Sequence, residues 1–200
     1  MSHAAAAHEH HYTSTGLDTW KLGFWTFIGS ECLFFGSLIA TYMVYKGQSI
    51  TGPYPHGPEG VLDIPLTTIS TFVLLMSSFN MVMALHAVKE GSRKGSIFWI
   101  LATAFFGSIF LGFQAYEFTH FYHAGLSLGQ NLFSASFFVL TGFHGAHVTV
   151  GVIWLLALWV LALRNKLPPE RATAVEVAGL YWHFVDVVWI AIFTLIYLIE

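Results

Sequence analysis

The chain has 200 residues, of which 56% are hydrophobic, 17% aromatic and only 10% charged, and its formal net charge is −3. Soluble domains carry roughly 25% charged residues, so this composition excludes an ordinary soluble domain and indicates an integral membrane protein. The single cysteine, Cys32, excludes an intrachain disulfide and metal sites built from several thiolates. No block of basic residues suggests binding to nucleic acid.

The first 19 residues are mainly alanine, histidine, serine and threonine. They lack both a basic start and an apolar core, so they do not resemble a secretory signal. We expect a flexible polar tail rather than a folded unit. Its four histidines are candidates for adventitious metal binding only: His3, His8, His10 and His11.

Residues 20–200 are predicted to form one transmembrane domain. A helix that crosses a bilayer needs about 20 mostly apolar residues, and five runs in this chain satisfy that requirement. They cover residues 22–45, 66–88, 97–118, 132–162 and 178–199. The predicted fold class is therefore an all-α integral membrane protein, a bundle of five transmembrane helices.

Basic residues fall almost entirely on one side of the predicted membrane. If the helices alternate in direction, only Lys46 lies on the opposite side from the other lysines and arginines. Those residues are Lys21, Lys89, Arg93, Lys94, Arg164, Lys166 and Arg171. Because cytoplasmic loops are enriched in Lys and Arg, we predict a cytoplasmic N-terminus and a C-terminus outside. The inner connection 164–176, with Pro168 and Pro169, is predicted as a rigid turn.

Several polar side chains fall inside the predicted helices, mostly in the inner half of the membrane. A buried polar or charged group in lipid is costly unless it is paired, so such residues are candidates for function. The candidates are Glu31, Asn80, His86, His144, His147, His183 and Asp186. His183 and Asp186 share one helix face within the stretch 181–189. The partner of Asp186 stays open between the histidines of the fourth helix, Glu31 through a shared proton, and a group on another chain.

Three interpretations of these residues compete. In the first, His144 and His147, one helical turn apart, bind a metal or haem together with His183 and Asp186. In the second, Glu31 and Asp186 line a path for protons or ions. In the third, which we favour, the polar groups fix the bundle by hydrogen bonds between helices. Small residues then allow close helix contact: Gly29 and Gly36 in the first helix, and Gly142, Ala146 and Thr149 in the fourth.

Five blocks of sequence occur in a characteristic order. They are residues 27–35 (FIGSECLFF), 85–94 (LHAVKEGSRK), 111–117 (LGFQAYE), 136–147 (SFFVLTGFHGAH) and 181–189 (YWHFVDVVW). In this order they resemble subunit III of the haem–copper terminal oxidases. Many members of that family have seven spanning helices, and the first two form one arm of a V-shaped, lipid-filled cleft. This chain resembles the shorter five-helix members, so another subunit supplies that arm or the cleft is open.

The resemblance implies a subunit that carries no haem and no copper and packs against subunit I, with subunit II and a small subunit IV as further candidate partners. It also implies bound phospholipid. Glu31 matches the buried glutamate of the family. Arg164 matches a basic residue that contacts a phospholipid phosphate in relatives, and a guanidinium suits such a bidentate contact.

We therefore expect a noncatalytic subunit III of a respiratory oxygen reductase in a bacterial plasma membrane. Its expected role is to stabilise a complex that reduces oxygen and pumps protons, to bind lipid and to support proton uptake. One alternative is an accessory subunit of a nitric oxide reductase. Another is an autonomous haem or metal enzyme that uses His144, His147 and His183. The sequence leaves open the electron donor, cytochrome c or quinol, the haem type and the number of other subunits.

Overall fold

The computed structural model describes residues 19–46 and 62–199; residues 1–18, 47–61 and 200 lie outside the described part. The predicted polar tail with its histidines, and most of the segment between the first two predicted helices, fall in these ranges. Within the described residues the main elements are α1 (Thr19–Tyr45), α2 (Ile64–Lys89), α3 (Arg93–His123), α4 (Leu132–Leu163) and α5 (Ala172–Phe193). A 3-10 turn, η1 (Pro169–Arg171), precedes α5, and a π-helical turn, η2 (Thr194–Leu198), follows it.

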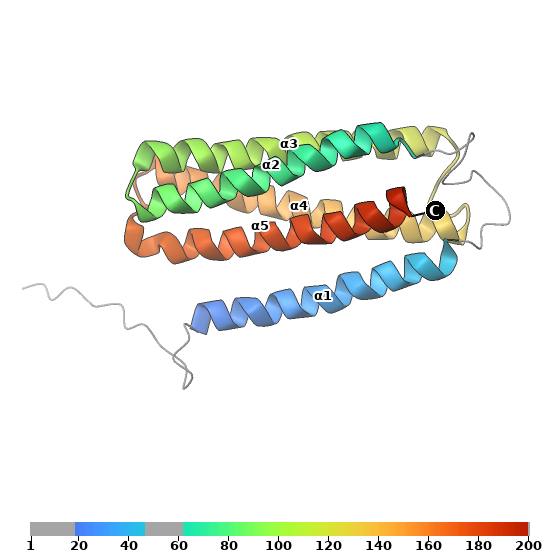
Figure 1. Cartoon of the computed structure of the whole chain (residues 1–200), viewed down its shortest axis with the longest axis horizontal. Coiled ribbons are helices and arrows are strands. Elements are labelled where there is room, and N and C mark those ends of the chain that lie inside the picture. Colours follow the sequence, from blue (N-terminus) through green and yellow to red (C-terminus); the bar gives the residue numbers. More distant parts are fainter. Residues whose placement is uncertain (1–18, 47–61, 200) are drawn as a thin grey trace, which may run out of the picture.

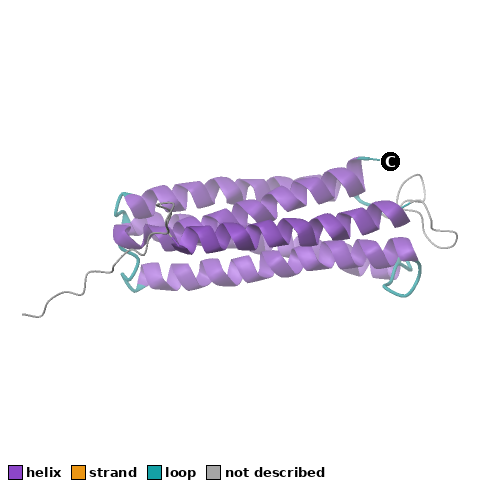
Figure 2. Cartoon of the chain, turned by 90° about the horizontal axis from the view of Figure 1, so that it is seen from below, coloured by secondary structure: helices purple, strands orange, loops and turns teal. Residues whose placement is uncertain are grey.

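All five helices are long and apolar enough to cross a membrane, which confirms the predicted fold class. They run along a common axis as one bundle (Figure 1, Figure 2). Helices α2, α3, α4 and α5 pack on one another, whereas α1 lies at one edge and contacts α4 and α5. Of the most apolar part of α1 only 17% is buried, against 61% for the segment that contains α5. The bundle therefore consists of four closely packed helices and one peripheral helix.

Polar side chains mark where the helices begin and end. The Asp63 carboxyl accepts from the Leu66 N–H (3.0 Å) at the start of α2, and the Asn131 side chain accepts from the Ser134 N–H (2.7 Å) at the start of α4. Such N-caps satisfy backbone donors that have no partner within the helix. Gly91, with φ of 69°, follows α2 in the left-handed conformation that commonly ends a helix.

The inner connection between α4 and α5 is shorter than predicted. Asn165, with φ of 55°, closes α4, and Pro169 begins the 3-10 turn that continues into α5 at Ala172. Proline is well suited to a first helical position because its missing N–H would have no partner there. The predicted loop 164–176 is therefore wrong at its end, since residues 172–176 are helical.

Two tryptophans of α5 join it to α2 at the centre of the bundle. Trp182 Nε1 donates to Ser77 Oγ (2.8 Å), and Trp189 Nε1 donates to Thr71 Oγ1 (2.9 Å). Each hydroxyl in turn donates to a backbone carbonyl of α2. Both indoles are almost fully buried. Because the N–H of a buried tryptophan needs an acceptor, these relays fix the register of α5 on α2.

Close helix contact occurs at other glycines than predicted. At Gly29, Gly36 and Gly142 an added Cβ would meet no atom within 4 Å. At Gly107 of α3 and Gly151 of α4 an added Cβ would lie 2.5 and 2.7 Å from the Trp182 ring. The glycines of the predicted stripes therefore make no close contact within this chain. Instead, Gly107 and Gly151 make room for the indole of Trp182, and Gly145 makes room for the amide of Gln114.

Helix α1 is attached to the bundle near both of its ends. At the C-terminal end Tyr42 is completely buried, and Lys46 Nζ donates to the carbonyls of Leu195 (3.4 Å) and Ile199. At the N-terminal end Lys21 forms a 2.9 Å salt bridge with Glu176 of α5. In the middle of α1, Phe35 is buried against His147 and Phe184, and the candidate site lies beside it.

Candidate functional site

The structure sorts the seven predicted polar residues into three groups by burial. Asn80, His144 and Asp186 are buried, and Glu31, His147 and His183 are partly buried. The prediction that His86 is buried is wrong: its side chain is 64% exposed and lies 3.9 Å from exposed Glu90. His86 belongs to the last turn of α2, where its side chain extends from the bundle.

The three histidines of the metal hypothesis do not converge. His144 stacks on Trp189, with ring centroids 4.8 Å apart, and neither of its ring nitrogens has a hydrogen-bond partner among the residues that the structure describes. His147 contacts Glu31, and His183 contacts Ser78. Among residues 19–46 and 62–199, no three His, Cys, Asp or Glu side chains group so that they could hold a metal ion. The described residues therefore offer no ligand set of the predicted kind.

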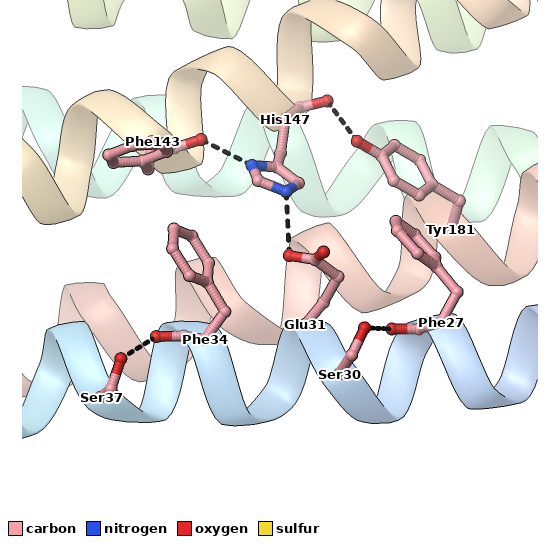
Figure 3. Close-up of polar contacts among 8 residues, drawn as sticks. All are labelled: Phe27, Ser30, Glu31, Phe34, Ser37, Phe143, His147 and Tyr181. Carbon is pink, nitrogen blue, oxygen red and sulfur yellow. Dashed lines mark hydrogen bonds and ion pairs between the residues drawn. The ribbon is translucent and has the colours of Figure 1, made fainter.

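Glu31 and His147 form an acid–base pair between α1 and α4 (Figure 3). Glu31 Oε2 lies 3.2 Å from His147 Nε2, and both side chains are 19% exposed. His147 Nδ1 lies 2.8 Å from the Phe143 carbonyl oxygen. A carbonyl can only accept, so Nδ1 carries a hydrogen and Nε2 of the neutral ring is an acceptor. A hydrogen bond to Glu31 then requires one further proton, which the carboxyl and the imidazole share.

Tyr181 of α5, the first residue of the block 181–189 and not one of the predicted candidates, contacts this pair. Its hydroxyl donates to the backbone carbonyl of His147 (3.0 Å), and its ring stacks on the imidazole with centroids 6.5 Å apart. Phe35 of α1 approaches the same imidazole edge-on at 4.9 Å. The ring of His147 is therefore held by contacts from three helices.

A groove runs between α1 and the pair α4–α5, and the acid–base pair lies in it. The groove consists of two adjoining cavities of about 850 and 560 Å³ that share Phe24, Phe27 and Trp154. The first cavity reaches Arg171 at the inner end of α5. The second reaches Glu31 and His147. The walls are mainly apolar and aromatic, so the groove suits a long apolar molecule.

His183 and Asp186 are neighbours of Ser78, on the contact between α2 and α5. The Ser78 hydroxyl lies 2.5 Å from His183 Nδ1. It also interacts with the Asp186 carboxyl, yet neither carboxyl oxygen has a hydrogen bond of good geometry among the described residues. The Asp186 carboxyl is therefore poorly paired within residues 19–46 and 62–199. Glu31, an earlier candidate for its partner, is bonded to His147 instead.

Two further buried polar residues of α3 were not included among the predicted candidates. Gln114 Nε2 donates to the Thr141 carbonyl of α4 (2.7 Å), and its amide lies against Gly145. The Glu117 carboxyl contacts the Thr67 hydroxyl of α2. Their spacing of three residues on one helix face is a signal that could have identified them. They join α3 to both of its neighbours.

Arg164, the predicted phosphate contact, ends α4 and is exposed. Arg93 Nη2 donates to the Leu163 carbonyl beside it (2.7 Å), and Arg171 Nη1 donates to the Lys166 carbonyl (3.2 Å). Several cations therefore gather at this end of the bundle, where two of the guanidiniums are held by backbone carbonyls.

These features define a polytopic helical membrane protein with a few interhelical polar contacts and one apolar groove. The family model described as "Cytochrome c oxidase subunit III" matches residues 1–200, and the chain belongs to that family. The chain is 41% identical over 177 residues to the "Quinol oxidase subunit 3" of Bacillus spizizenii, and 40% identical over 177 residues to that of Bacillus subtilis. Each of these alignments covers 88% of this chain and 85% of the relative. It is 37% identical over 185 residues to the "Probable quinol oxidase subunit 3" of Staphylococcus saprophyticus, covering 90% of this chain and 88% of the relative.

Family membership confirms the resemblance seen in the sequence. The chain is a subunit III of a haem–copper quinol or cytochrome oxidase, and it is a multi-pass membrane protein. As such it assembles with the other oxidase subunits, to which the haems and copper belong.

Proposed function

We propose that this chain is the noncatalytic subunit III of an oxidase that takes its electrons from a quinol. The observation that carries the choice of donor is the similarity, over most of both chains, to subunits named for quinol oxidases. An affinity tag on this chain should recover a complex with haem and copper from bacterial plasma membranes. Oxygen uptake by that complex should be rapid with a quinol and slow with reduced cytochrome c. The opposite preference would exclude a quinol as the electron donor. Reduction of nitric oxide without reduction of oxygen would favour the alternative, a nitric oxide reductase.

We further propose that subunit I is the main contact, with subunit II and a small subunit IV as additional partners. Large apolar side chains cover the outward faces of the helices, as faces that meet lipid or other subunits require. The distribution of basic residues supports a cytoplasmic N-terminus and an outer C-terminus. Mass spectrometry of the purified complex would identify the partners, and reporter fusions at the two ends would test the orientation.

The proposed role of this chain within the complex is to sustain turnover. By covering the core subunits and placing polar side chains in the inner half of the membrane, it supports proton uptake by the core. A complex stripped of this chain should start at a similar rate and lose activity sooner than the intact complex. Equal lifetimes of the two preparations under continuous turnover would contradict this role.

We also propose that Arg164 holds a phospholipid phosphate at the inner surface. The residue is exposed at the end of α4, among other cations, and a guanidinium binds phosphate in a bidentate manner. Arg164→Ala should lower the phospholipid that stays with the purified complex by about one molecule per complex. The matched control is Lys94→Ala, which removes an exposed charge near the start of α3. Equal phospholipid content, measured as phosphorus, in the two variants would contradict this role of Arg164.

A further inference from the structure

The groove between α1 and α4–α5 combines an apolar channel with a deep polar end. The shared wall of Phe24, Phe27 and Trp154 makes its two cavities continuous. Their volumes of about 850 and 560 Å³ together are sufficient for a large lipid-soluble molecule. The groove begins at Thr19 and Arg171 and extends to Glu31, about 18 Å further along α1 at 1.5 Å per residue.

The polar end offers a specific hydrogen-bonding pattern. Because His147 Nδ1 donates to the Phe143 carbonyl, one hydrogen joins His147 Nε2 to the Glu31 carboxyl. That hydrogen is engaged between the two side chains, so the polar end offers the second Glu31 oxygen as an acceptor for the hydroxyl of a ligand. In Figure 3 the second oxygen of Glu31 makes no dashed contact with the other residues drawn. Both side chains keep 19% of their surface exposed, and both line the groove.

We propose that this groove binds a prenylated quinol, with the ring at Glu31 and His147 and the prenyl tail along the aromatic wall. The ring is uncharged and flat, one of its hydroxyls can donate to the second Glu31 oxygen, and its faces suit contact with Phe27 and Tyr181. A phospholipid fits less well, because its charged headgroup stays near the membrane surface. Its acyl chain would then leave the acid–base pair facing hydrocarbon, without a partner.

The site binds the molecule without oxidising it, since the redox centres belong to other subunits. It would hold a local store of the electron donor beside the core of the complex. This inference rests on the proposed function, in which a quinol is the donor.

The test uses the intact purified complex without oxygen and a photoreactive azido-quinol with a prenyl tail. After illumination, mass spectrometry should find the label on peptides from α1 and α4, and excess unmodified quinol should remove it. Ala146→Phe fills the groove beside His147, because Ala146 lines the inner cavity wall and is exposed to it. The matched control is Ala157→Phe, which adds the same side chain at an exposed position of α4 that does not line the groove.

Labelling should fall at least about tenfold in Ala146→Phe and stay unchanged in Ala157→Phe. Glu31→Gln keeps the shape of the side chain and removes the acid, so it should weaken retention of the quinol by about tenfold, as loss of one charge-assisted hydrogen bond predicts. Glu90→Gln, the same change at an exposed carboxyl, should have no effect. Labelling that is absent from α1 and α4, or that Ala146→Phe leaves unchanged, would overturn the inference, as would release of phospholipid instead of quinol.

The two proposals fail in different ways. If the complex oxidises quinol while the groove stays unlabelled, only the groove site is wrong. If the complex oxidises cytochrome c alone, the proposed donor is wrong, whatever the labelling shows.

Discussion

Replacing Gly151 with valine should remove most of this subunit from the assembled complex. The Cβ of any residue at position 151 would lie 2.7 Å from the Trp182 ring, which is rigid and enclosed by α2, α3 and α4. Overpacking of a closed core costs up to about 3 kcal/mol, more than a hundredfold in an equilibrium constant. The measurement is the amount of this chain, relative to haem, in the purified complex after mild heating. Gly107→Val, on the opposite side of the indole, should have the same effect.

The matched control is Gly142→Val, also in α4, where an added Cβ meets nothing within 4 Å. It tests whether valine in this helix is harmful in itself. We expect normal retention of this variant, because the stripe that includes Gly142 is not a close contact within the chain. Equal loss of the Gly142 and Gly151 variants would show that the space around Trp182 does not decide stability.

Trp189→Ala should destabilise the bundle by about 3–5 kcal/mol, the usual range for removing a large buried aromatic side chain. Trp189 is 2% exposed, stacks on His144 and meets Phe110 edge-on at a centroid distance of 4.8 Å. Its removal would leave a cavity and end the hydrogen bond to Thr71. The melting temperature of the subunit within the complex should therefore fall. Tryptic digestion of membranes at increasing temperature would measure it.

Trp189→Phe should cost much less, because the Thr71 hydroxyl still donates to the Thr67 carbonyl and keeps one partner. The control is Trp25→Ala, since Trp25 is 56% exposed on α1. A melting temperature that falls equally in Trp25→Ala and Trp189→Ala would contradict a central role for Trp189.

The number and class of helices could be predicted because each apolar run is long enough to span a bilayer. The start of α5 could not be predicted by the same rule. Glu176 interrupts the apolar run, and only the structure shows that Lys21 of α1 pairs with it at 2.9 Å. A charge inside a helix is acceptable when a partner from a distant segment is available, and hydropathy contains no information about that partner.

The sequence could predict which residues belong to the candidate site but not which of them contact each other. The cost of burying polar groups selected Glu31, His147 and Asp186, and the structure places these side chains in buried or partly buried positions. Which of them meet depends on how each helix is rotated about its axis and which helices are neighbours. Glu31 therefore bonds to His147 rather than to Asp186. His86 was misplaced because depth along a helix does not reveal which face points inward.

The attachment of α1 through Lys46 has a consequence for synthesis in the cell. Lys46 donates to the Leu195 carbonyl, 149 residues later in the chain. A ribosome makes about 5–20 residues per second, so α1 must wait roughly 7–30 s in the membrane before this contact can form. During that interval its groove-lining face is open to whatever lipid-soluble molecules surround it. Helix α1 thus precedes its last attachment by the length of the other four helices, and shortening the chain before Leu195 would remove the contact with Lys46 while the salt bridge of Lys21 with Glu176 could still form.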